Sequence, residues 1–207
     1  MNSKLRNLQA ACAIGACIAA TAGAGPLEDG DAAYHDQDYA KAAELWQPLA
    51  EKGDATAEYY IGNLYAEGKG VPQDDKAAFM WYQRAAERGN AMAQYNVGAS
   101  YAEGVGVDKN PADAVKWFRR AADQGMPFAQ LNLGLLYAAG AGVKQDNVEA
   151  LKWLEIAFRG LPAGGARMDV ANAMKEITAK LRWDEVDDAK QRAQRWRAKL
   201  EATPAAK

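Results

Sequence analysis

Small and apolar residues recur along this chain with a period of 36 residues. Within one copy, Ala57, Ile61 and Tyr65 share the spacing of one face of an α-helix, and Trp81 and Ala85 belong to a second face of the same kind. A glycine-rich stretch separates the two faces in every copy. A fixed period of this length indicates stacked helix pairs. The copies span 55–90, 91–126 and 127–162.

When the 36-residue copies are aligned, glycines and aromatic residues recur at equivalent positions, which we call columns. A glycine falls inside the first predicted helix at Gly62, Gly98 and Gly134. A tyrosine follows at Tyr65, Tyr101 and Tyr137, and the second helix carries Trp81, Trp117 and Trp153. Glycine inside a helix costs about 1 kcal/mol relative to alanine. The repeated glycine therefore predicts close packing of a large ring against bare backbone, with these tryptophans and tyrosines as the expected rings.

The turn between the two helices has its own signature. Two glycines in three residues suit a chain that leaves a helix through positive φ, and they stand at Gly68, Gly70, Gly104, Gly106, Gly140 and Gly142. Asn110 before Pro111 predicts an N-cap followed by proline at the first helical position. Asp146 with Glu149 predicts a capping box. Gly89 and Gly125 are expected to end second helices.

The pattern Ala-x-x-x-x-Gly-x-x-Tyr-x-x-Gly-x-Gly-Val, then Ala-x-x-Trp-(Tyr/Phe)-x-x-Ala-Ala, resembles the Sel1-like repeat, a relative of the tetratricopeptide repeat. The resemblance implies an all-α fold, a right-handed α-solenoid of stacked helix-turn-helix repeats whose inner surface holds protein partners. The third copy departs from the pattern at Leu154, Phe158 and Gly160, as expected of a last repeat beside a cap.

The flanking segments predict caps at both ends of the solenoid. Residues 29–54 fit an incomplete first unit, a tetratricopeptide-like helix pair in which Pro48 should kink or end the second helix. Residues 163–207 predict closing helices and a frayed tail, with helices expected over 167–181 and from Trp183 to about Leu200.

The N-terminal segment has the features of an export signal. Lys4 and Arg6 precede an uncharged apolar stretch, and a small-x-small site predicts cleavage after Ala24, so that residues 1–24 are a signal peptide. The stretch is too short for a confident membrane span. A periplasmic or secreted protein without a transmembrane segment is expected. The alternative is a lipoprotein anchored through Cys17 in a lipobox-like sequence.

Charge and cysteine content narrow the classes of partner. Both cysteines lie in the predicted signal, so the mature chain has neither disulfides nor thiolate metal sites. The full chain has 25 Lys and Arg against 27 Asp and Glu, and loss of Lys4 and Arg6 leaves a net charge of −4. An acidic chain without a dense basic stripe is a poor candidate for nucleic acid. Peripheral association with the envelope stays open.

Few residues of the mature chain could carry chemistry. His35 and Ser100, its only histidine and serine, lie in separate predicted units, which argues against a catalytic triad. The acid pairs 74–75 and 187–188 fit helix N-termini better than a metal site. No catalytic residue, cofactor or metal is therefore expected, and the chain is predicted not to be an enzyme.

The face of each first helix opposite its core stripe is the candidate contact surface. The candidate partner-binding residues are Tyr60, Asn63, Glu67, Asn96, Glu103, Asn132 and Leu135. Amide side chains in the column of Tyr60 could hydrogen-bond an extended peptide. The basic run over 190–199 is a second candidate surface, read first as a solvated helix end.

These features predict a non-catalytic protein–protein interaction scaffold of the bacterial cell envelope, which holds a protein or peptide in its concave groove. The alternatives are an enzyme that interacts with peptidoglycan or β-lactams and an envelope lipoprotein with a structural role. Carbohydrate as the groove's ligand also stays open.

Overall fold

In the computed structural model, the described residues 25–202 form ten α-helices and no strand. The helices are α1 (Pro26–His35), α2 (Tyr39–Glu51), α3 (Ala55–Glu67), α4 (Asp75–Glu87), α5 (Ala91–Glu103), α6 (Pro111–Asp123), α7 (Pro127–Ala139), α8 (Asn147–Gly160), α9 (Gly165–Thr178) and α10 (Trp183–Ala202). The predicted signal peptide, its cleavage site and Cys17 lie outside the described residues.

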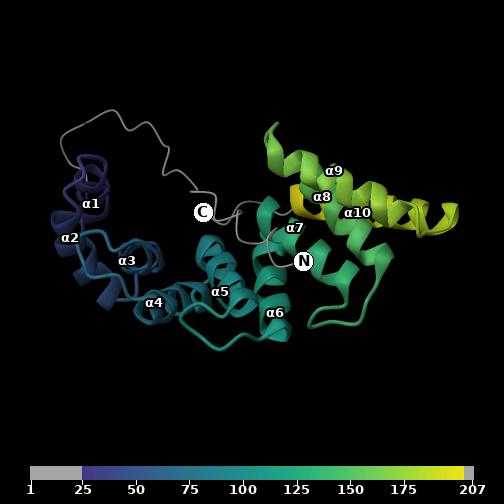
Figure 1. Cartoon of the computed structure of the whole chain (residues 1–207). Helices are drawn as coiled ribbons and strands as arrows, with labels where there is room; N and C mark the ends of the chain where they lie inside the picture. Colours follow the sequence, from purple (N-terminus) through teal and green to yellow (C-terminus); the bar gives the residue numbers. More distant parts are fainter. Residues whose placement is uncertain (1–24, 203–207) are drawn as a thin grey trace.

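The helices form an all-α solenoid. Each helix from α1 to α8 packs against the next along the chain, and the stack follows an arc from α1 at one end to α9 at the other (Figure 1). Helices α3, α5 and α7 lie along the inner side of this arc, whereas α4 and α6 lie along its outer side. The three predicted helix pairs are therefore the body of the molecule.

Capping side chains define where the second helices begin. Asp74 accepts hydrogen bonds from the backbone N–H groups of Lys76 and Ala77, and Asn110 caps α6 with Pro111 at its first position, as predicted. The prediction of a capping box between Asp146 and Glu149 is wrong. The Asp146 side chain does accept from the Glu149 N–H, but the Glu149 carboxylate accepts from Trp153 Nε1 at 2.9 Å and does not turn back to Asp146.

The glycine inside each first helix faces the second helix of the same unit. A Cβ on Gly62 would lie 2.6 Å from the Tyr82 ring, and a Cβ on Gly98 would lie 2.8 Å from the Phe118 ring. The expected packing of rings on bare backbone is thus confirmed in two units, although the rings come from the residue after each tryptophan. In the third unit, Leu154 approaches Gly134 in the same way.

The second glycine of each turn abuts the preceding unit. Gly106 has φ +70°, and a Cβ there would lie 2.1 Å from the backbone oxygen of Asp75 at the start of α4. A Cβ on Gly70 would lie 2.5 Å from the backbone of Tyr39, and a Cβ on Gly142 would lie 2.2 Å from that of Pro111. Positive φ and the lack of room both require glycine here, so successive units meet by main-chain contact.

The first helix pair packs around a tryptophan. Trp46 is fully buried, its Nε1 donates to the backbone oxygen of Leu27, and its ring fills the space where Gly30 has no side chain. The prediction that Pro48 ends this helix early is wrong, because α2 continues to Glu51. A proline three residues from the end of α2 leaves most of its hydrogen bonds intact.

The final helix does not extend the stack. Helix α10 packs back on α8, where Trp196 meets Trp153 with ring centroids 5.7 Å apart. Trp153 is consequently 1% exposed. Ile156 also lies under this contact, at the column that holds Arg84 and Arg120 in the earlier units. An apolar residue at that column gives α10 a surface on which to pack.

Candidate functional site

The first residue of the candidate contact column is part of an aromatic cluster. The Tyr60 ring lies 4.6 Å from the Trp46 ring and is half-buried. Burial raises the pKa of Tyr60 to about 12, and the nearby charge of Asp31 adds to the rise. Tyr60 therefore offers a neutral hydroxyl and a partly exposed ring at the N-terminal end of the inner side.

The two asparagines of the same column differ in exposure. Asn96 is partly exposed and hydrogen-bonds Tyr82, whose hydroxyl donates to Asn63 Oδ1 at 2.8 Å. Asn132 is only 4% exposed, so it does not share the surface expected for this column. Its Oδ1 has no hydrogen-bond partner among the described residues. At the position that holds Tyr82 one unit earlier, the chain has Phe118, which lacks the hydroxyl that Asn96 hydrogen-bonds.

The accessible candidates lie toward the C-terminal ends of the inner helices. Glu67 is exposed and pairs with Lys69 at 2.6 Å, while Glu103 and Leu135 are partly exposed. Ala139, at the end of α7, is exposed as well. The structure therefore places part of the predicted set on one surface, and partner binding by these residues stays a prediction.

The tryptophan column is only partly interior. Arg84 stacks on Trp81 at 4.3 Å and Arg120 stacks on Trp117 at 4.5 Å, measured from the guanidinium carbon to the ring centroid. Both rings are partly buried and pack against the hydrophobic core. The sequence contained a signal for this stacking, because each arginine follows its tryptophan by three residues. Side chains at positions i and i+3 of a helix are neighbours.

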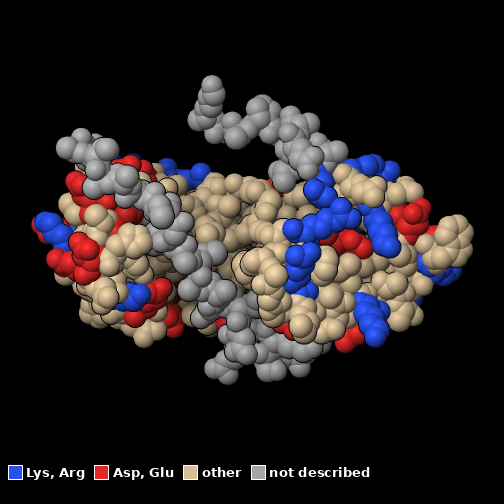
Figure 2. Space-filling view, turned by 90° about the horizontal axis from the view of Figure 1, so that it is seen from above, with Lys and Arg blue, Asp and Glu red and all other residues tan. Residues whose placement is uncertain are grey.

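Charge is distributed unevenly on the face seen from above. Figure 2 shows mainly acidic side chains over the end that holds α1 to α3 and mainly Lys and Arg side chains over the end that holds α8 to α10. The part of the face between them that is not drawn in grey is uncharged. The segment 26–38 has five acidic residues and no Lys or Arg, which accounts for the acidic end.

The residues considered for chemistry have structural roles or lie apart. His35 is exposed at the end of α1, whereas Ser100 is in α5. Asp74 caps α4, and Asp188 forms an ion pair with Arg192 at 2.6 Å. This pairing lowers the pKa of Asp188, chiefly through its hydrogen bond with Arg192. Between residues 25 and 202 no helix has the length and apolarity needed to cross a membrane.

The fold and the inner surface define a repeat-built α-solenoid, a class whose members work through the surfaces of their stacked helices. The Sel1 repeat model matches residues 19–54, 55–90, 91–126 and 127–160. The chain belongs to the Sel1 repeat family. The first matched range includes the helix pair that the sequence predicted to be an incomplete unit.

Two solved structures show the same architecture. A Sel1 repeat protein from Oxalobacter formigenes is 35% identical over 70% of this chain and 59% of its own, with a TM-score of 0.65. The c5321 protein, a protective antigen present in uropathogenic Escherichia coli strains, is 25% identical over 88% of this chain and 49% of its own, with a TM-score of 0.50. This chain thus spans 59% of the length of the first relative and 49% of the length of the second. No curated protein sequence matches it.

Proposed function

We propose that this protein is a non-catalytic scaffold of the bacterial cell envelope that holds an extended protein segment along α3, α5 and α7. The observation that carries the proposal is the uncharged stretch between an acidic and a basic end on the face seen from above (Figure 2). Sel1 repeat proteins generally mediate protein–protein interaction, which supports a protein as the ligand.

The charge distribution favours a partner of matching polarity. A segment whose basic residues lie over α1 and whose acidic residues lie over α8 to α10 would be attracted at both ends. Exposed charges are screened beyond about 8 Å at physiological ionic strength. The affinity for such a segment should therefore fall as salt concentration rises.

The envelope location rests on the N-terminal sequence and on the relatives. Cleavage after Ala24 would release a periplasmic or secreted protein, and lipidation of Cys17 would anchor the same solenoid to a membrane. The similar c5321 protein is a protective antigen present in uropathogenic Escherichia coli strains.

Site-specific photo-cross-linking in the native envelope tests the scaffold function. A photoreactive residue replaces Glu67 or Ala139 on the inner helices, and the matched controls carry it at Lys76 or Lys116, which are exposed on α4 and α6. We expect both inner positions to capture the same partner protein and neither control to capture it. These sites are exposed, so folding should be preserved.

The cross-linked segment then supplies a direct binding measurement. A synthetic peptide of that segment should bind the purified protein in a salt-sensitive manner, and a peptide with reversed charges should bind at least tenfold more weakly. Equal capture from inner and outer positions, or equal binding of both peptides, would sink the proposal.

A further inference from the structure

A buried polar residue recurs near the start of each inner helix. Gln94 and Gln130 are each 2% exposed. The Gln94 Nε2 donates to the backbone oxygen of Ala86 at 3.1 Å, and the Gln130 Nε2 donates to that of Ala122 at 3.2 Å. The two amides are therefore held in the same way, one unit apart.

In the earlier units a side chain from the end of the second helix completes this arrangement. The Gln124 Nε2 donates to Gln94 Oε1 at 2.7 Å and to the backbone oxygen of Gly89 at 3.0 Å. One unit before, Arg88 stands at the column of Gln124 and its Nε lies 3.3 Å from the buried Glu58 carboxylate. The recurring residue is thus matched by a donor each time.

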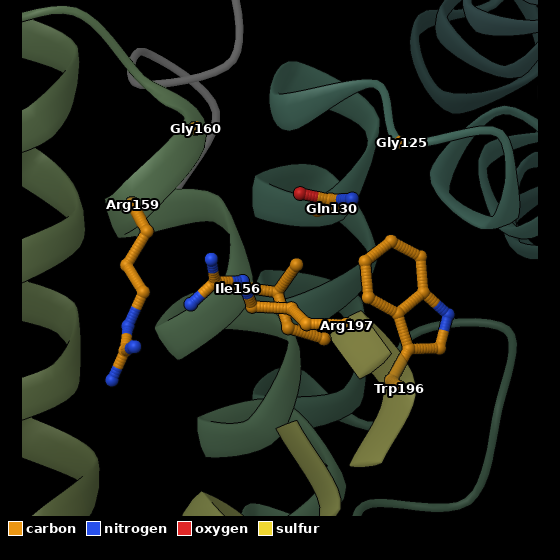
Figure 3. Close-up of a pocket in the computed structure, with 7 residues that line it drawn as sticks. All are labelled: Gly125, Gln130, Ile156, Arg159, Gly160, Trp196 and Arg197. Carbon is orange, nitrogen blue, oxygen red and sulfur yellow. The ribbon is translucent and has the colours of Figure 1, made fainter. Parts of the chain in front are cut away.

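The third unit has Gly160 at that column and so lacks the donor. A hollow of about 180 Å³ is found there. It is lined by Gly125, Gln130, Ile156, Arg159, Gly160, Trp196 and Arg197 (Figure 3). Gly125 and Gln130 correspond to the two acceptors of the Gln124 amide, Gly89 and Gln94. The Gln130 oxygen points to the side of Gly160 (Figure 3), which has no side chain that could donate to it, while the Gln130 Nε2 donates to Ala122.

We propose that this hollow binds a primary carboxamide from a partner, as carried by a glutamine or asparagine side chain. The carboxamide N–H₂ would donate to Gln130 Oε1 and to the backbone oxygen of Gly125, as Gln124 does one unit earlier. Its oxygen would face Arg159 and Arg197. This site is separate from the groove residues and does not depend on the proposed scaffold function.

The chemistry of the lining selects this ligand class. A carboxylate has no N–H to donate to Gln130 Oε1. An ammonium or guanidinium group could donate, but it would lie beside two arginines at the edge of the hollow. A carboxamide both donates and accepts without carrying charge.

Nuclear magnetic resonance titration with three matched probes tests the site on the native chain. The probes are the N-acetyl N-methylamides of glutamine, glutamate and norleucine, which differ only in the end of the side chain. We expect saturable shifts of the Gln130 side-chain amide and the Trp196 indole N–H with the glutamine probe, at a dissociation constant of about 1 mM. The other two probes should bind at least tenfold more weakly, and equal binding of all three would overturn the proposal.

A double variant provides the second arm. Gly160→Gln supplies the missing side chain, and Pro127→Ala accompanies it because a Cβ on Gly160 would lie 2.8 Å from Pro127 Cγ. The unit before has Ala91 and Gln124 at these columns. The double variant should lose binding of the glutamine probe, while Pro127→Ala alone should retain it. If the folded double variant still bound the glutamine probe, the proposal would be contradicted. If the double variant does not fold, the comparison of the three probes on the native chain still tests the proposal.

Discussion

Phe118 stands where the preceding unit has Tyr82, and this exchange removes one hydroxyl from the interior. Tyr82 donates to Asn63 Oδ1 and is hydrogen-bonded by Asn96, whereas Asn132 Oδ1 is buried without a partner among the described residues. A buried acceptor left unpaired costs about 1 to 3 kcal/mol. Copies of one unit therefore differ in stability through single atoms.

Phe118→Tyr should raise the free energy of unfolding by about 1 kcal/mol, because its hydroxyl can donate to Asn132 Oδ1. Chemical denaturation of both proteins measures the change. The same substitution in an Asn132→Ala background is the control, since the acceptor is then absent and the gain should vanish. An equal gain in both backgrounds would show that the hydroxyl acts elsewhere.

The carboxylate of Asp31 should make the stability of the folded protein depend on pH. Burial raises the pKa of Asp31, the charge of Glu28 adds to the rise, and its Oδ1 has no partner among the described residues. The folded state therefore disfavours the ionised form, so this group reduces stability as pH rises through its unfolded and folded pKa values. Asp31→Asn should stabilise the protein at pH 7 by a few tenths of a kcal/mol, because Asp31 is partly exposed and solvent screens its charge.

Urea denaturation at two pH values checks this sign. The gain from Asp31→Asn should be absent at pH 3, below the ordinary pKa of about 3.9 for an aspartate. Asp36→Asn is the matched control because Asp36 is exposed in the same segment, and it should change little at either pH. A larger gain at pH 3 than at pH 7 would reverse the argument.

At the scale of elements, α10 acts as a lid on α8 rather than as a further step of the stack. Its contact combines the Trp153–Trp196 ring pair with the apolar surface of Ile156 and an Arg192 guanidinium 3.8 Å from the Glu149 carboxylate. The tryptophans of the earlier units lie under arginines instead. The residue at this one column therefore distinguishes the units: it is an arginine in the internal units and Ile156 in the unit that α10 covers.

Trp196→Ala should destabilise this end of the molecule by about 2 kcal/mol, through loss of the ring surface that is partly buried against Trp153. Hydrogen exchange should show lower protection of amides in α8 and α10, with α3 and α4 unchanged, because repeats contact only their neighbours. Trp183→Ala is the matched control, since Trp183 is 83% exposed at the start of the same helix. Comparable losses from both variants would argue against the lid.

Much of the whole molecule could be predicted from the sequence. The 36-residue period predicted the helix pairs, and the turn glycines predicted where chains reverse, because both signals are local and repeated. The return of α10 to α8 could not be predicted, since its apolar residues give a face but not the surface that the face covers. The burial of Asn132 was missed for a related reason, because the position of a residue within the repeat does not show which side chains of other helices cover it.

The close backbone contacts of Gly70, Gly106 and Gly142 with the preceding units help to keep the shape of the arc. Each sets the spacing between neighbouring units through backbone atoms alone, on the loops and away from the inner face. Side chains on α3, α5 and α7 can therefore change without altering the radius of curvature. Geometry and specificity are encoded in separate parts of the same 36 residues, so such a unit can acquire new ligands while its curvature is inherited unchanged.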